Sequence, residues 1–389
     1  RWKATKNVGA YGIRPSASTR YVLGACNFSV CNFSACIRAY AIRPYKLNIL
    51  IGVICGEKST PTVTGCGILH VNIKRCTKTI KKMNHAFIIQ VHNYPEQLKE
   101  IIDLLHAENH YFFINVDKKV DDHPFKEALK GYSNIFFTSG KERTNVNHAG
   151  FSQIRCTLRL LRMARSMNMD YYHSLSGQDF PCVNNKTFDD FFESCDSKSY
   201  MHYDSPEEAK AWAKDKYPNR YRRYYAYDMP GGNCKPVKIV IRVLNKFFSF
   251  LPQRSEINNV AAGWSWFSWH KQVVDYVLKY LNDTPKFLNR FKYTACCDEV
   301  IFHTMLNDLD KKLNIEKYNC LRFIEWHPHR AFKTLPLVLN QSEYKEIIDS
   351  GCFFCRKTHP TESQQLKLML KEYIHDLDSP HSSYGQKFE

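Results

Sequence analysis

The amino-acid sequence predicts an α/β fold built around a mostly parallel, doubly wound sheet. Two observations predict it. Beyond residue 84, short continuous apolar runs alternate with segments whose apolar residues recur at helical spacing. Continuous apolar runs are typical of parallel strands, because helices cover both faces of a parallel sheet. The strand–helix–strand order also favours parallel pairing, since each helix returns the chain to the edge at which the preceding strand began.

The first unit of this pattern ends at Asp117. Residues 86–91 (AFIIQV) form a continuous apolar run and are predicted to be a buried strand. Pro95 suits the first turn of a helix, because that position needs no backbone N–H donor, and this helix is expected to reach Ala107. Residues 111–116 (YFFINV) are the second predicted strand.

The same alternation continues along the chain. The predicted elements are a short helix at 125–129, a third strand at 134–137, a long helix at 150–167 and a fourth strand at 171–175. In the long helix, Ile154, Leu158 and Leu161 fall on one face, as expected for a helix that covers a sheet. Four strands and three helices therefore account for the first half of the domain.

The second half is less regular. Helices are predicted at residues 237–250, 271–281, 298–309 and 342–349. The Cys352-Phe-Phe-Cys355 segment fits either a redox or zinc half-site or a buried strand with small apolar cysteines. The two intervening Phe favour the strand. The sequence contains no Walker loop, no G-x-G-x-x-G, no serine nucleophile elbow and no H-E-x-x-H.

Polar residues directly follow three of the predicted strands. These are His92-Asn93, Asp117-Lys118 and the segment from Ser176 to Asp179. Ligands of open α/β sheets bind beyond the carboxyl ends of the strands. The three segments are therefore the candidate ligand positions.

The basic charge of the chain is concentrated in its first 82 residues. The whole chain has a formal net charge of +17, which suggests a nucleic-acid binder. Residues 1–82 hold 14 Lys and Arg and one acidic residue, Glu57, whereas residues 83–389 hold 41 Lys and Arg against 37 Asp and Glu. A charge of +4 on 307 residues argues against a nucleic-acid partner for that part of the chain.

Residues 1–82 also differ in composition. They contain none of the eight Met and six of the 15 Cys, and they show no long amphipathic or alternating pattern. We expect a leader that is disordered or not native, with translation beginning at Met83. Its apolar run at 47–55 is too short to span a bilayer. The expected organisation is this leader, one domain at 83–360, and a C-terminal helix and tail at 361–389.

Aromatic residues gather in two segments. Residues 217–227 hold five Tyr and three Arg, and residues 263–270 (GWSWFSWH) hold Trp264, Trp266 and Trp269. Ring faces stack on sugars while neighbouring charged groups bind the hydroxyls, so both segments are candidates for carbohydrate binding. Packing in the core is the alternative for each single ring, and a nucleic-acid stacking platform is the alternative for the cluster.

Charged residues near the C-terminal half complete the candidate site. Glu299 follows Cys296-Cys297-Asp298 in the sequence. It could act as a general base, or it could simply lie in the first turn of a helix capped by Asp298. Lys333, Arg356 and Lys357 could neutralise a diphosphate, or they could be solvated basic turns. There is no D-x-D motif beside Asp117.

Taken in order, several segments resemble the core-2/I-branching β-1,6-N-acetylglucosaminyltransferases and the related peptide O-xylosyltransferases. The resemblance covers about residues 84–360. The segments that carry it are 86–93 (AFIIQVHN), 111–118 (YFFINVDK), 173–181 (HSLSGQDFP), 263–269 (GWSWFSW), 297–301 (CDEVI) and 352–357 (CFFCRK). The resemblance implies a GT-A-type nucleotide-sugar fold, an inverting mechanism and independence from a divalent metal.

The resemblance also implies roles for single residues. Glu299 matches the catalytic base, and Lys357 with Lys333, or with Arg330 instead, matches the basic pair that holds the diphosphate beside Arg356. The other expected donor-site residues are Val91, His92, Asp117, Ser176 and Asp179, and the expected acceptor-site residues are Trp264, Trp266, Arg222 and Tyr224.

We therefore expect an enzyme without cofactor or metal that moves GlcNAc from UDP-GlcNAc to a hydroxyl of a glycan or glycolipid acceptor. A UDP-xylose-dependent O-xylosyltransferase and a non-catalytic carbohydrate-binding protein are the alternatives. Departures from the family's pattern at Gly263-Trp-Ser-Trp266, at Cys355 and at residues 147–150 (NHAG) bear on the donor sugar and the acceptor.

The expected compartment depends on the origin of the chain. A bacterial member would be cytoplasmic or peripherally associated with the inner membrane, and a truncated eukaryotic member would be in the Golgi lumen. No nucleic-acid partner is expected in either case.

Overall fold

A computed structural model describes residues 82–208, 220–231 and 234–377. The chain divides into two units, residues 1–75 and 76–389, and all described residues belong to the second. The predictions made for the leader, apart from Lys82, thus fall outside the described residues. So do the first three residues of the Tyr- and Arg-rich segment and the tail after Leu377.

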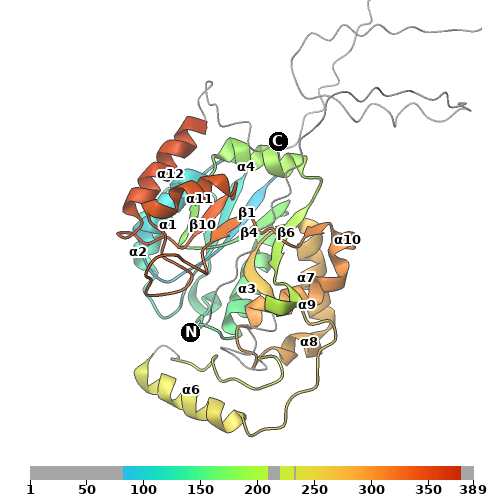
Figure 1. The fold of residues 1–389 in the computed structure, drawn as a ribbon. Coiled ribbons are helices and arrows are strands. Elements are labelled where there is room, and N and C mark those ends of the chain that lie inside the picture. Colours follow the sequence, from blue (N-terminus) through green and yellow to red (C-terminus); the bar gives the residue numbers. More distant parts are fainter. Residues whose placement is uncertain (1–81, 209–219, 232–233, 378–389) are drawn as a thin grey trace, which may run out of the picture. The chain divides into compact units, whose positions relative to one another are not determined.

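The central sheet has the strand order β3-β2-β1-β4-β7-β6-β8 (Figure 1). Its first four strands are parallel, as predicted: β1 (His85–Val91), β2 (His110–Val116), β3 (Ile135–Phe137) and β4 (Tyr171–Ser176). Each begins or ends within one residue of its predicted bounds, because the apolar runs that define these strands are unbroken.

The second half of the sheet was not predicted. β7 (Gly263–His270) pairs antiparallel with β4 and with β6 (Ser199–Tyr203), and β8 (Ile315–Glu316) completes the edge. A Cβ atom at Gly263 would collide with the carbonyl oxygen of His202, so only glycine lets the two strands approach there. The Trp-rich segment is therefore a central strand of the sheet.

A smaller sheet has the order β5-β10-β9. Its strands are β5 (Asp179–Pro181), β10 (Phe354–Arg356) and β9 (Arg322–Ile324). Cys355 is fully buried in β10, so the strand interpretation is confirmed for Phe354 and Cys355, whereas Cys352 precedes the strand and is half-buried. Arg356 pairs with Asp179 across β10 and β5, so this small sheet positions two predicted donor-site residues.

Helices cover both faces of the central sheet. Their bounds are α1 (Pro95–Leu105), α2 (His123–Ala128), α3 (Ser152–Arg165), α4 (Asn185–Ser194), α6 (Lys235–Phe248), α7 (Lys271–Asp283), α8 (Pro285–Arg290), α9 (Ile301–Leu306), α10 (Asp310–Leu313), α11 (Tyr344–Asp349) and α12 (Gln364–Leu377). Short 3-10 turns lie at Gly140–Glu142, Cys297–Glu299, Asn307–Leu309 and Gln341–Glu343. The helix predicted at 298–309 is therefore broken into α9 and two flanking 3-10 turns.

The core has two parts, one on each face of the sheet. Ala86 and Ile88 of β1 belong to the part under α3, α7 and α9, whereas Phe87, Ile89 and Val91 belong to the part under α1, α4 and α12. Figure 1 shows α7 and α9 on the side of the sheet opposite α1 and α12. Burial on both faces explains why β1 reads as a continuous apolar run rather than an alternating one.

None of the helices that the structure describes combines the length and the apolar character needed to cross a membrane.

Candidate active site

The carboxyl ends of β1, β2 and β4 meet at one edge of the sheet. Val91 pairs with Val116, and its neighbour Gln90 pairs with Ser176. The backbone N–H of Asp117 donates to the carbonyl oxygen of Val91 at 2.8 Å. Parallel pairing thus brings the predicted donor residues of all three strands together, as expected for a doubly wound sheet.

Asp117 is a buried carboxylate at this edge, with 6% of its surface exposed. It accepts hydrogen bonds from the backbone N–H of Lys119 at 3.0 Å and from Lys119 Nζ at 2.7 Å. The neighbouring His92 is exposed at its surface, yet its pKa is lowered, because partial desolvation and the charges of Lys119 and Arg356 disfavour its cation, although Asp117 opposes them. The edge therefore presents a fixed carboxylate beside a neutral imidazole at neutral pH.

Arg356 joins the donor loop to the central sheet. Its Nη1 donates to Ser176 Oγ and lies 3.3 Å from Asp179 Oδ2, and Asp179 is fully buried. Its guanidinium carbon Cζ lies over the ring of Trp266, 4.4 Å from the ring centre. Arg356 is thus fixed by Asp179, Ser176 and Trp266, and it is not a solvated basic turn.

Lys357 lies beside the segment that carries Lys333. Its Nζ donates to Thr334 Oγ1 at 2.9 Å. Burial lowers the pKa of Lys357, and the charge of Arg356 lowers it further. Lys333 is exposed next to Thr334, whereas the alternative Arg330 forms an ion pair with Glu343 at 2.8 Å. Lys333 is thus the chain neighbour of a residue that contacts Lys357, and its role in holding the diphosphate stays a prediction.

Glu299 lies in the 3-10 turn Cys297–Glu299 and accepts a hydrogen bond from Arg220 Nη1 at 2.9 Å. The Arg220 side chain is 2% exposed, and that of Glu299 is 26% exposed. A buried guanidinium thus holds a carboxylate that solvent can still reach. Arg220 was missed, because nothing in the Tyr- and Arg-rich segment distinguishes it from Arg222 and Arg223.

Asp298 does not cap a helix, contrary to the alternative considered from the sequence. It accepts hydrogen bonds from Ser265 Oγ at 2.7 Å and from Gln153 Nε2 at 3.4 Å. Burial raises its pKa. These contacts anchor the turn that carries Glu299 to β7 and α3.

β7 contacts both the turn that carries Glu299 and the side chain of Arg356. Ser265 contacts Asp298, next to Glu299, while Trp266 points to the other face and packs on Arg356. The Trp264 ring packs against that of His202, with ring centres 4.1 Å apart and planes tilted by 33°, and its centre lies 6.4 Å from that of Trp326. Trp326 is half-buried and was not predicted.

The family model for "Branch: Core-2/I-Branching enzyme" matches residues 85–348 of the chain. The chain belongs to the core-2/I-branching enzyme family. Xylosyltransferase 2 of Homo sapiens is 23% identical over 321 residues, which cover 75% of this chain and 33% of that protein. A xylosyltransferase of Ciona intestinalis is 22% identical over 284 residues, or 70% of this chain and 30% of that protein. The chain thus spans about a third of the length of these curated relatives.

The fold agrees with this membership. A mixed α/β domain with a large, mostly parallel central sheet is consistent with the predicted GT-A-type fold. A solved mannose-1-phosphate geranyltransferase from Thermus thermophilus is 8% identical, with a TM-score of 0.24, over 57% of this chain and 67% of that one. That likeness is too slight to bear on the fold of this core-2/I-branching enzyme.

Trp269 belongs to the core and not to a sugar site. It is fully buried, and its ring lies 3.6 Å from that of Phe267, so its interpretation as a sugar-stacking residue is wrong. Arg222 forms an ion pair with Glu256 at 2.9 Å, and the Tyr224 ring lies 4.9 Å from the guanidinium of Arg254. The described contacts join neither residue to Trp264 or Trp266, so their role in acceptor binding stays a prediction.

The arrangement of this core-2/I-branching enzyme can support group transfer. Glu299 can accept a proton, and Arg356 and Lys357 can stabilise a departing diphosphate. Trp264 and its aromatic neighbours offer ring faces on which a sugar can stack. Among the described residues, side chains that could bind a metal ion lie close together away from this edge, at His85, His110 and Asp189.

Proposed function

We propose that this core-2/I-branching enzyme is an inverting glycosyltransferase that moves GlcNAc from UDP-GlcNAc to a hydroxyl group of a glycan or glycolipid. The observation that carries the proposal is the link through β7 between the Arg220-held Glu299 carboxylate and the Trp266-packed Arg356. Ser265 and Trp266 are neighbours on β7, and they contact the turn that carries the proposed base and the side chain of the proposed cation. A single displacement needs a base and a cation site held in fixed positions.

In the proposed reaction, Glu299 takes the proton of the acceptor hydroxyl as its oxygen attacks the anomeric carbon. The bond from that carbon to the diphosphate breaks, and UDP leaves with the electron pair. Lys357, together with Lys333, meets the charge that develops on the diphosphate. Attack opposite the leaving group inverts the anomeric centre, so one carboxylate suffices.

The donor is proposed to bind at the carboxyl edge of the sheet. Val91, His92 and Asp117 would line the uridine and ribose pocket, and Ser176 and Asp179 would lie under the donor sugar. Because lysines supply the positive charge, the proposed reaction needs no divalent metal at this edge and no cofactor. The acceptor would stack on Trp264 and Trp266.

UDP-xylose is the second candidate donor. It is favoured by the names of the relatives, which are xylosyltransferases. A non-catalytic protein that binds UDP or a glycan without turnover is the remaining alternative, and the bonded Glu299 argues against it.

The test is a panel of UDP-sugars with mass-spectrometric detection of UDP release and of glycosylated acceptor, in EDTA. Circular dichroism in the same buffer shows whether the chain stays folded. We expect turnover of UDP-GlcNAc in EDTA and its loss in Glu299→Gln. Turnover that stops in EDTA while the fold persists, or that survives in Glu299→Gln, would overturn the mechanism. If the enzyme prefers UDP-xylose, then UDP-xylose and not UDP-GlcNAc is the donor.

We also propose that the enzyme associates peripherally with membranes through α6. The helix exposes a stripe of apolar side chains, Ile239, Val243 and Phe247, which are 59%, 61% and 60% exposed. A parallel stripe holds the exposed cations Lys235, Lys238, Arg242 and Lys246. Adjacent apolar and basic stripes suit a helix lying in the interface of an anionic bilayer.

A further inference from the structure

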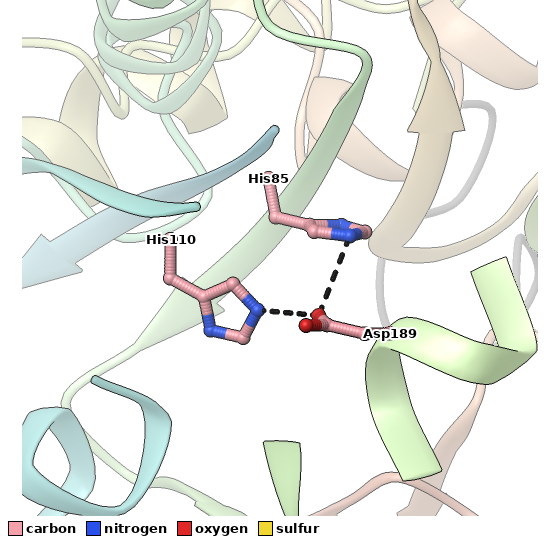
Figure 2. A group of neighbouring side chains, drawn as sticks. All are labelled: His85, His110 and Asp189. Atoms are coloured by element: carbon pink, nitrogen blue, oxygen red, sulfur yellow. Dashed lines mark hydrogen bonds and ion pairs between the residues drawn. The ribbon is translucent and has the colours of Figure 1, made fainter. Parts of the chain in front are cut away.

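Three buried polar side chains converge at the end of the central sheet opposite the proposed donor edge (Figure 2). His85 and His110 are the first residues of β1 and β2, and Asp189 projects from α4. One ligand atom of each lies within 4.8 Å of the others. Val91 lies six residue steps along β1 from His85, which is about 20 Å at the usual rise.

The contacts within this group are unequal. His110 Nε2 lies 2.8 Å from Asp189 Oδ1, and His85 Nε2 lies 3.6 Å from the same oxygen. Both imidazoles are fully buried. His85 Nε2 has no hydrogen-bond partner among the described residues, although it points at the carboxylate. A buried polar atom without a partner is costly, and its orientation toward two other ligand atoms points to a missing ligand.

The protonation of His110 follows from its second contact. Its Nδ1 lies 2.6 Å from the carbonyl oxygen of Leu105, which can only accept a hydrogen bond, so Nδ1 carries the proton. In the neutral ring, Nε2 then presents a lone pair to Asp189 Oδ1. Two lone pairs at 2.8 Å need a positive charge between them, which is either a proton or a metal ion.

His85 differs from His110, because its neighbour is another imidazole, which can either donate or accept a hydrogen bond. Its Nδ1 lies 3.1 Å from His173 Nε2, and His173 Nδ1 lies 2.9 Å from Ser268 Oγ. If each ring donates from Nδ1, His85 Nε2 also presents a lone pair to Asp189. A single proton serves only the His110–Asp189 pair and leaves His85 Nε2 unpaired, whereas a metal ion accepts all three lone pairs.

Each of the three side chains also has an outer partner that fixes its orientation. The imidazoles are held by the carbonyl oxygen of Leu105 and by His173, and Asp189 Oδ2 lies 3.1 Å from Lys82 Nζ and 3.3 Å from Asn109 Nδ2. Metal-binding histidines and carboxylates in proteins are supported in this manner.

We propose that His85, His110 and Asp189 bind one divalent transition-metal ion, with Zn²⁺ as the ion their donor set fits. Ligands about 2.0–2.1 Å from tetrahedral Zn²⁺ lie about 3.4 Å apart, so the His85–Asp189 spacing fits and the His110–Asp189 pair opens by about 0.6 Å. Binding releases any proton that His110 and Asp189 share. Rings of Phe188 and Tyr171, with centres 5.2 and 5.9 Å from that of the His85 ring, help to enclose the group.

The test uses the full chain, stripped of metal with a chelator and titrated with Zn²⁺ and with Co²⁺. We expect one bound equivalent by mass spectrometry of the metal, a rise in unfolding temperature, and visible Co²⁺ bands typical of nitrogen and oxygen ligands. Bands of Co²⁺–thiolate bonds would instead place the ion on cysteines, six of which lie in residues 1–82, and would overturn the proposal.

Matched variants localise the ion. Asp189→Asn keeps the shape of the side chain but removes its charge, and His85→Gln removes the unpaired nitrogen, so both should lose the bound equivalent. His173→Gln, which alters an outer partner, should weaken binding about 10- to 100-fold. His303→Gln is the control, because His303 is equally buried and also has an unpaired nitrogen, Nδ1, outside the group.

Besides thiolate bands, two further outcomes contradict the inference. One is a full equivalent retained by Asp189→Asn, and the other is a stripped wild-type chain that takes up no metal and unfolds at an unchanged temperature. The wild-type Co²⁺ titration decides the question alone if the variants fail to fold. Because the measurements are bound metal and unfolding, they do not depend on the proposed transferase activity.

Discussion

At the scale of single residues, the proposed chemistry depends on two charges in different surroundings. Glu299 is partly exposed and bonded to a buried Arg220. Lys357 is half-buried, bonded to Thr334, and lies beside Arg356 in the chain. Arg220 therefore holds the Glu299 carboxylate in place, whereas burial and the charge of Arg356 disfavour the charged form of Lys357.

The Arg220–Glu299 pair predicts that Arg220 positions the base. In Arg220→Met, Glu299 loses the guanidinium that orients it, so kcat should fall by about 100-fold, within the range of general-base contributions. The KM for the UDP-sugar should change little, and Arg220→Lys should restore part of kcat. Steady-state kinetics provide the measurement, with Arg223→Met as the control. Equal losses in Arg220→Met and Arg223→Met would show that Arg220 has no positioning role.

The lowered pKa of Lys357 predicts a limit on the alkaline side of the pH profile. The lysine must be protonated to hold a diphosphate, and burial and Arg356 lower its pKa below 10.5, so UDP affinity should fall at a lower pH than for an ordinary lysine. Lys357→Arg, whose cation persists to higher pH, should move this limb upward. The measurement is calorimetric titration with UDP at a series of pH values. If UDP affinity falls at the same pH in Lys357→Arg as in the wild type, the fall belongs to another group.

For single residues, the sequence predicted which residues form the candidate site better than it predicted which of them contact one another. Asp117, Ser176, Asp179, Arg356 and Lys357 were predicted, and the first four lie where strand ends meet. Arg220 and Trp326 were missed, because their place in the site follows from tertiary contacts that the sequence does not show. Arg356 shows the same limit: its bonds to Asp179 and its packing on Trp266 cannot be inferred from a basic pair in the sequence.

At the scale of elements, β7 is the connection on which the site depends. One of its faces contacts the Asp298 turn, and the other packs on Arg356. The four parallel strands were predictable, because burial on both faces makes them continuous apolar runs. β7 was not, because its alternating Trp and Ser resemble a binding segment as much as a strand, and its partners β4 and β6 are distant in sequence.

The surface of α6 predicts binding to anionic vesicles. The double variant Val243→Asp with Phe247→Asp should abolish sedimentation with such vesicles, because it puts charge on the apolar stripe. Lys238→Gln should weaken binding about fivefold, since each cation near an anionic surface contributes about 1 kcal/mol. Leu368→Asp on α12, where Leu368 is 48% exposed, is the control. Binding that both α6 variants retain, or that neutral vesicles support equally, would contradict the proposal.

At the scale of the whole molecule, the two ends of the central sheet have different proposed tasks. The carboxyl ends of β1, β2 and β4 gather the donor-site residues, and the amino ends of β1 and β2 hold His85 and His110 against Asp189. Residues 1–82, which carry most of the formal positive charge of the chain, lie outside the described residues except for Lys82, whose Nζ lies 3.1 Å from Asp189 Oδ2.

The sequence by itself determined the α/β class, the parallel half of the sheet and the edge at which the candidate donor residues meet, because hydrophobic periodicity and strand order are local properties. Only the tertiary structure decided which charges pair. Glu299 with Arg220, Arg356 with Asp179, and His85 with His110 and Asp189 are separated by 79 to 177 residues or lie on different elements. Such pairings depend on chain crossovers that no local pattern encodes.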